Sequence, residues 1–105
     1  MSVIKEGVTI SFMGGVVKLT GDIEYLASKD ALIFHPVGEP EEVLTVNLEA
    51  YNLSPGEGCV FLRDYSQHEG LFASLAEAGV IEPQPVRVYS RGPHGARFYE
   101  TRISA

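Results

Sequence analysis

Residues 66–79 read SQHEGLFASLAEAG, and this segment is the one place in the chain where the spacing of apolar residues predicts a helix. Ser66 and Glu69 have the spacing of a capping box, in which each side chain bonds the backbone N–H of the other residue. Gly79 stands where a left-handed residue commonly ends a helix. The apolar residues that follow the helical period are Leu71, Phe72, Leu75, Ala76 and Ala78.

Outside this segment the chain reads as strands and turns. Alternating or continuous apolar runs predict strands at residues 8–12, 16–19, 23–27, 31–35, 43–48, 59–62, 86–91 and 97–103. Two prolines and a glycine make residues 36–41 an irregular loop, and Gly21-Asp22 predicts a chain reversal. The predicted fold class is α+β. We expect about seven short, mostly antiparallel strands forming a curved sheet or open barrel, with one helix (roughly 66–79) before a C-terminal hairpin.

Composition indicates a single soluble globular domain over residues 1–105, with 45% apolar and 21% charged residues. No apolar run approaches the ~20 residues of a membrane span, and no signal-peptide pattern is visible, so we expect a cytoplasmic protein. Cys59 has no partner for an internal disulfide and lies beside an apolar run, which favours a buried, inert thiol. No metal or other cofactor is expected.

Charge is distributed unevenly along the chain. Residues 1–82 carry four basic and thirteen acidic side chains, a net charge of −9, while residues 83–105 carry four arginines and one acid, a net charge of +3. A basic end on an acidic body suggests association of opposite patches or a local anion site. The same arginines are also typical of an edge strand protected against unwanted pairing.

The register of the C-terminal hairpin decides what its side chains can do. If Arg91 pairs with Arg97, one face collects Arg87, Tyr89, Arg91, Arg97 and Tyr99 as a binding platform. If Arg91 pairs with Phe98, the arginines are divided between the two faces of an ordinary edge hairpin. The second register is slightly favoured, because it buries Ile103 and places Arg87 near Glu100.

Catalytic patterns are weak. The densest titratable cluster, residues 64–69, is explained by helix capping, and the scattered histidines His35, His68 and His94 lack metal-ligand spacing. No serine or cysteine lies in a nucleophile motif, and Glu41 and Glu42 read as solvated charges that point to opposite sides. An enzyme is therefore the less favoured class.

Three functional hypotheses follow. The leading one is a non-catalytic interaction module, a small accessory, inhibitor or regulatory protein that docks through a sheet face or the arginine-rich hairpin. Its partner would be another protein or a second copy in a homodimer, and the net charge of −6 disfavours nucleic acid. The alternative is a ligand-binding protein or small enzyme with an apolar pocket between helix and sheet, using Tyr25, His35, Asp64 or His68. A third is an acidic mimic of nucleic acid, with Glu24, Glu39, Glu41, Glu42 and Glu49 on one surface.

Overall fold

A computed structural model describes residues 2–91 and 96–104, except for the side chain of Arg91. The turn predicted at 92–95 lies outside the described residues. The strands are β1 (Ser2–Phe12), β2 (Val17–Leu26), β3 (Ala31–Pro36), β4 (Glu42–Val43), β5 (Cys59–Arg63), β6 (Arg87–Arg91) and β7 (Ala96–Arg102). The α-helix is α1 (Leu71–Glu77), and the 3-10 turns are η1 (Met13–Gly15), η2 (Ala27–Lys29), η3 (Glu49–Tyr51) and η4 (Ser66–His68).

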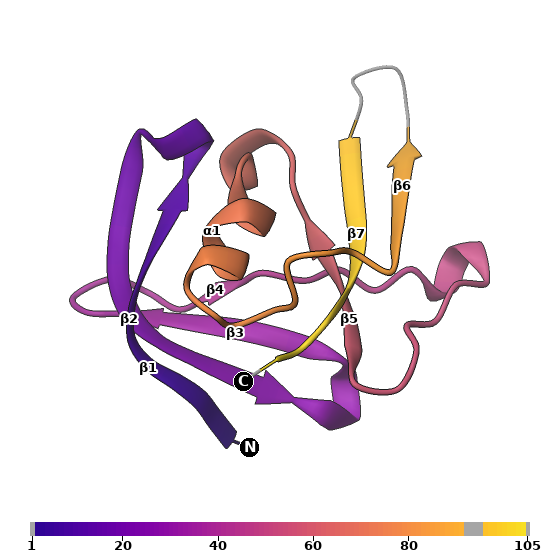
Figure 1. The fold of residues 1–105 in the computed structure, drawn as a ribbon, viewed down its shortest axis with the longest axis horizontal. Coiled ribbons are helices and arrows are strands. Elements are labelled where there is room, and N and C mark those ends of the chain that lie inside the picture. The colour runs from indigo at the N-terminus through magenta and orange to yellow at the C-terminus, as the bar shows by residue number, and fades with distance from the viewer. Residues whose placement is uncertain (1, 92–95, 105) are drawn as a thin grey trace.

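The strands form two antiparallel sheets with α1 between them (Figure 1). The first sheet has the order β1-β2-β3-β4 and the second the order β5-β7-β6. An antiparallel bridge between Thr45 and Leu62 joins the sheets, and Val46 donates a backbone hydrogen bond of 2.9 Å to the carbonyl of Phe61. The predicted α+β fold is confirmed. Within the described residues the sheets do not close into a barrel, and β1, β4, β5 and β6 are the outermost strands of the two sheets.

β2 is one long strand where the sequence predicts two strands and a reversal. A Cβ atom at Gly21 would collide with the carbonyl oxygen of His35 on β3, so the glycine permits a close approach of two strands rather than a turn. The predicted strand at 43–48 is mostly wrong, because β4 ends at Val43 and only Thr45 makes a further bridge.

The predicted helix is confirmed, but its N-terminus has a different cap. η4 is a separate 3-10 turn, and Gly70, with a φ of 85°, divides it from α1. Ser66 has a φ of 54°, outside the extended conformation of an N-cap residue. The carboxylate of Asp64 instead accepts hydrogen bonds from the backbone N–H groups of Gly70 and Phe72, each 2.9 Å long. The predicted capping box between Ser66 and Glu69 is therefore wrong.

The C-terminus of α1 and its buried face agree with the sequence. Gly79 has a φ of 79°, and its N–H donates to the carbonyl of Ala76 at 3.1 Å. The N–H of Val80 donates to the carbonyl of Leu75 at 3.0 Å, which completes a Schellman motif. Leu71 and Leu75 are fully buried in the main core, against side chains from both sheets.

A smaller core lies on the other face of the second sheet. It consists of Leu48, Phe61 and Phe98, with the half-buried Tyr65 and Tyr89 packed against it. The second sheet therefore has a buried surface on each side, which explains why β5 shows no polar alternation.

Candidate functional site

The C-terminal hairpin has neither of the two predicted registers. Arg91 lies opposite Ala96, and Arg87 lies opposite Glu100. Directly paired residues share a face, so Arg87, Tyr89 and the Arg91 position lie on one side of the sheet. Arg97 and Tyr99 pair with Ser90 and Val88 on the other side. The predicted platform of arginines and tyrosines on one face is therefore wrong.

Both tyrosines are used for packing, which explains the register. Tyr89 makes an edge contact with Phe61, with ring centroids 5.9 Å apart and an interplanar angle of 84°. Tyr99 stacks on Phe72 of α1 at 4.7 Å and 29°. Such aromatic pairs contribute about 0.5–1.5 kcal/mol beyond their buried area. One face of the hairpin is therefore anchored by Tyr89 beside the buried Phe98, and the other face by Tyr99.

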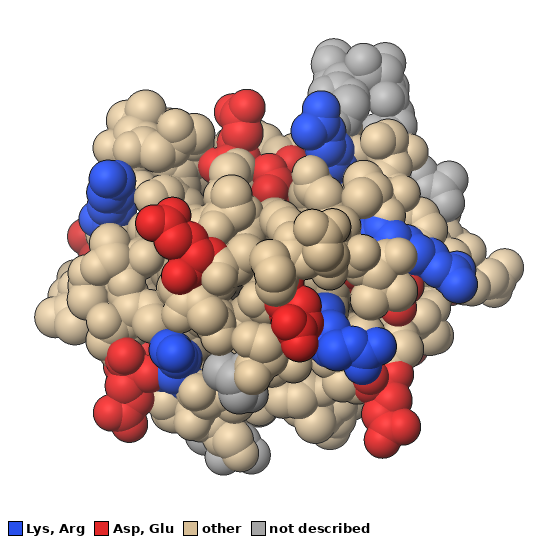
Figure 2. Space-filling view, viewed as in Figure 1, with Lys and Arg blue, Asp and Glu red and all other residues tan. Residues whose placement is uncertain are grey.

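The described arginine side chains of β6 and β7 are exposed and lack acidic partners among the described residues. Arg87, Arg97 and Arg102 are exposed, and no carboxylate among the described side chains lies within 4.0 Å of them. Figure 2 shows basic side chains over β6 and β7, on the right of the view, with acidic side chains spread over the whole face. The hairpin thus offers unpaired positive charge beside an edge strand.

A second feature is a buried histidine in contact with a glutamate. Nε2 of His68 lies 2.9 Å from Oε1 of Glu42, which joins η4 to β4. The His68 side chain is 7% exposed and that of Glu42 is 43% exposed. Burial, and then the positive charge of Arg63, lower the pKa of His68 below its ordinary value of 6.5, while Glu42 and Asp64 oppose this shift. His68 is therefore neutral at pH 7.

The charge states of His68 and Glu42 determine which nitrogen of His68 carries the proton. A neutral imidazole carries one proton, and the carboxylate of Glu42 can only accept, so Nε2 of His68 is the protonated nitrogen. Nδ1 is then a free acceptor, since it has no hydrogen-bond partner among the described residues. The other carboxylate oxygen of Glu42, Oε2, also has no partner there.

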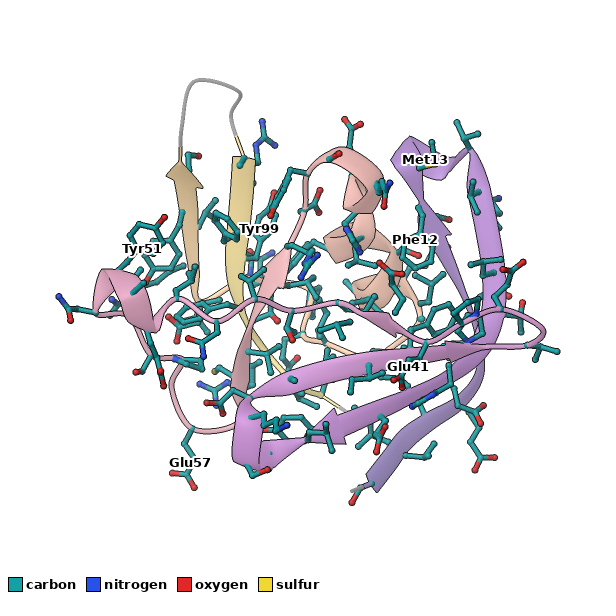
Figure 3. All side chains as sticks on the ribbon, turned by 180° about the vertical axis from the view of Figure 1, so that it is seen from behind. Phe12, Met13, Glu41, Tyr51, Glu57 and Tyr99 are labelled. Carbon is teal, nitrogen blue, oxygen red and sulfur yellow. The ribbon has the colours of Figure 1, made fainter. Side chains whose placement is uncertain are left out.

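A cleft of about 220 Å³ opens beside this pair, at the end of the β1–β2 hairpin. Its polar lining consists of Glu39, Glu42, Gln67 and His68. Its apolar lining consists of Phe12, Met13, Val17, Leu19, Pro36 and Pro40. Figure 3 labels Phe12 and Met13 on this hairpin. In two further clefts, of about 480 and 390 Å³, every ionisable side chain in the lining is exposed. The smaller cleft is therefore the better candidate site.

This cleft lies elsewhere than the sequence predicts. The space between α1 and the sheets is filled by the fully buried Leu71 and Leu75. Of the four polar residues expected in a pocket, His68 alone lines the 220 Å³ cleft, while Asp64 caps α1 and Tyr25 packs against the main core.

His35 belongs to a separate cluster on the outer face of the first sheet. Its Nε2 lies 2.8 Å from Oε1 of Glu24, and its Nδ1 lies 3.7 Å from Oε2 of Glu41. Glu24 is 3% exposed, and its Oε2 is buried without a hydrogen-bond partner among the described residues. Glu41 and Glu42 contact histidines on opposite faces, so they are more than solvated charges. The acidic residues of the mimic hypothesis therefore do not share one surface.

Other chemistry has little support in the geometry. In residues 2–91 and 96–104, no three His, Cys, Asp or Glu side chains are grouped to hold a metal ion. Cys59 is 1% exposed, and burial raises the pKa of its thiol, as its apolar neighbours in the sequence suggest. Burial of this cysteine is confirmed.

Sequence reasoning missed the contact between Glu42 and His68, although one signal was present. Glu42 lies just before the predicted strand at 43–48 and two residues before Leu44, so in an extended segment it belongs to the same, inward face as Leu44. No protein-family model matches the chain, and no curated protein or solved structure is significantly similar to it.

Proposed function

We propose that this protein is a non-catalytic interaction module that binds an extended, acidic segment of a partner protein along the edge of β6. The observation that carries the proposal is a strand edge that no described strand covers, next to arginines that have no acidic partner among the described side chains. Strand addition to such an edge uses backbone hydrogen bonds for affinity and side-chain charge for specificity.

The edge itself supports the proposal. β6 pairs with β7 alone among the described strands, and the right-hand side of β6 in Figure 1 carries no further strand. Val86 and Val88 are 45% and 54% exposed, so an incoming strand would cover apolar surface as well as backbone groups. Each backbone hydrogen bond contributes about 0.5–1.5 kcal/mol net, and a strand of five residues makes several.

Charge favours an acidic partner over a second copy at this edge. In the register that pairs the whole of β6 with β6 of a second molecule, Arg87 of one copy lies opposite Arg91 of the other. Like charges directly opposite destabilise a strand pair. A homodimer, if formed, would instead use the acidic body of the second copy.

We also propose a cytoplasmic location, which the unpaired Cys59 supports. No helix in the described residues is long and apolar enough to cross a membrane.

A peptide experiment tests the proposal. The probe is a seven-residue peptide of alternating glutamate and valine, and its control replaces glutamate with lysine. We expect the acidic peptide to bind, to shift the backbone amide NMR signals of residues 86–91, and to bind more weakly as salt rises. Equal binding of both peptides would remove the charge argument.

A pair of variants separates partner binding from mere protection of the edge. Arg87→Gln should weaken acidic-peptide binding by about tenfold, equivalent to ~1.4 kcal/mol. Lys18→Gln makes the same charge change on β2 and should leave binding unaltered. If the arginines only protect the edge, Arg87→Gln leaves peptide binding unchanged and promotes aggregation. Light scattering at low and high salt, against the monomer mass of 11.4 kDa, detects self-association.

A further inference from the structure

The cleft beside His68 is built from segments that are tied together. The N–H of Gly14 in η1 donates a 3.0 Å hydrogen bond to the carbonyl of Glu69, which fixes the tip of the β1–β2 hairpin against the end of η4. The bond between Glu42 and His68 fixes β4 against the same turn. The ring of Phe12 makes an edge contact with the imidazole of His68, with centroids 5.9 Å apart and an interplanar angle of 74°. The cleft therefore has a preformed wall.

The charge of the cleft has one sign. Glu39 and Glu42 are its charged lining residues, and no lysine or arginine of the described residues lines it. Arg63 is near enough to influence His68, but its guanidinium donates to the carbonyl of Thr45 at 3.1 Å and does not line the cleft. A cation is therefore attracted to this cleft and an anion is repelled.

Apart from the amide of Gln67, which can both donate and accept, the hydrogen-bonding side chains of the cleft also have one preference. Nδ1 of neutral His68 and Oε2 of Glu42 are acceptors without a partner among the described residues, and the carboxylate of Glu39 can only accept. An ammonium group is the complementary ligand group, because it has three donors and no acceptor. A hydroxyl group would satisfy fewer of these acceptors.

We propose that this cleft binds a small organic amine, with a compact apolar body against Phe12 and Leu19 and with its ammonium group at His68, Glu42 and Glu39. The volume of about 220 Å³ equals the space of about seven liquid waters at ~30 Å³ each, so the apolar body is small. This site is independent of the β6 edge, and its binding does not rest on the proposed partner.

The test compares two probes of equal size. Cyclohexylamine and cyclohexanol each have seven non-hydrogen atoms, but only the amine is charged at neutral pH. Titration of the full chain is followed by the backbone amide NMR signals at ~0.15 M salt, where distant charges are screened. We expect the amine to bind at least about tenfold more tightly than the alcohol, with the largest shifts at residues 17–19 and 67–69. Equal affinities, or shifts centred elsewhere, overturn the proposal.

Two neighbouring glutamates provide a matched pair of variants. Glu42→Gln removes the negative charge from the cleft while its amide oxygen still accepts from His68, and it should weaken amine binding by about tenfold. Glu41→Gln removes the same charge from the opposite face, where Glu41 lies near His35, and should change amine binding less than about twofold. An equal effect of the two variants would indicate diffuse attraction only and would overturn the proposal.

A variant that fills the cleft tests the location of the site without changing Glu42 or His68. Leu19→Trp adds bulk to the apolar wall and should abolish binding of the amine and the alcohol alike. Amine binding that survives this change places the amine outside the cleft and rejects the site. Failure here leaves the β6 proposal untouched, because that proposal is measured with a peptide and at other residues.

Discussion

Asp64→Ala should destabilise the protein by about 2–3 kcal/mol, because it removes both acceptors at the start of α1. The carboxylate bonds the N–H groups of Gly70 and Phe72, each at 2.9 Å. Two charge-assisted hydrogen bonds contribute about 1.5–3 kcal/mol each. Asp64 is only partly buried, so water can reach the freed N–H groups. The net loss of unfolding free energy is therefore close to ~2 kcal/mol, the upper end of the range for N-cap substitutions. A domain of this size has about 5–15 kcal/mol of stability, so the variant still folds.

Urea unfolding followed by circular dichroism measures this loss. Ser66→Ala is the matched control, because Ser66 is exposed and makes no capping hydrogen bond, and we expect a change below about 0.5 kcal/mol. Asp64→Asn keeps one acceptor oxygen and should lie between the two. If Ser66→Ala costs as much as Asp64→Ala, the cap described here is wrong and the capping box expected from the sequence is right.

Two further predictions concern packing and pH. Gly21→Ala should cost about 3 kcal/mol or more in the same unfolding assay, because its Cβ meets the carbonyl oxygen of His35, while Gly56→Ala, with its nearest neighbour 3.4 Å away, should cost less than about 1 kcal/mol. In the unfolded chain His68 binds a proton with its ordinary pKa of 6.5. In the folded protein burial lowers that pKa, so protonation of His68 is disfavoured. The unfolding free energy should therefore fall as the pH drops below 6.5, and His68→Gln should remove this part of the pH dependence. A slope that is unchanged in the variant would show that other groups cause it.

The sequence predicts features that depend on local pattern. The apolar face of α1 and the ending at Gly79 follow from helical spacing and from the conformation that glycine tolerates. Most strand positions follow from alternating or continuous apolar runs, except that β2 is a single strand and β4 ends at Val43. Cys59 is buried as its apolar neighbours indicate. In each case the residues that decide the structure lie within a few positions of one another, so one sequence contains the necessary information.

The sequence fails where the deciding contact is not part of the local pattern. The motif at Ser66 and Glu69 is locally convincing, but Asp64 bonds the same helix end and η4 takes another conformation. The hairpin register was open because alternation alone did not show that Tyr89 is needed against Phe61. Gly21 resembles a turn residue until the backbone of β3 is placed beside it. Contacts made by residues outside the local pattern override local propensity at each of these positions.

The sequence also does not show which distant segments form the two candidate sites, the acidic cleft and the β6 edge. Their opposite charges make the two sites compatible. The acidic cleft lies at the end of the β1–β2 hairpin, and the unpaired arginines lie on the second sheet, beyond α1 in Figure 1. Sites of opposite charge on separate sheets can select a cation and an anion without competing, provided that each acts locally. Local action has a measurable consequence: Glu42→Gln should alter amine binding alone, and Arg87→Gln should alter acidic-peptide binding alone. If either variant changes both, the overall field of the molecule governs binding, and neither site is specific.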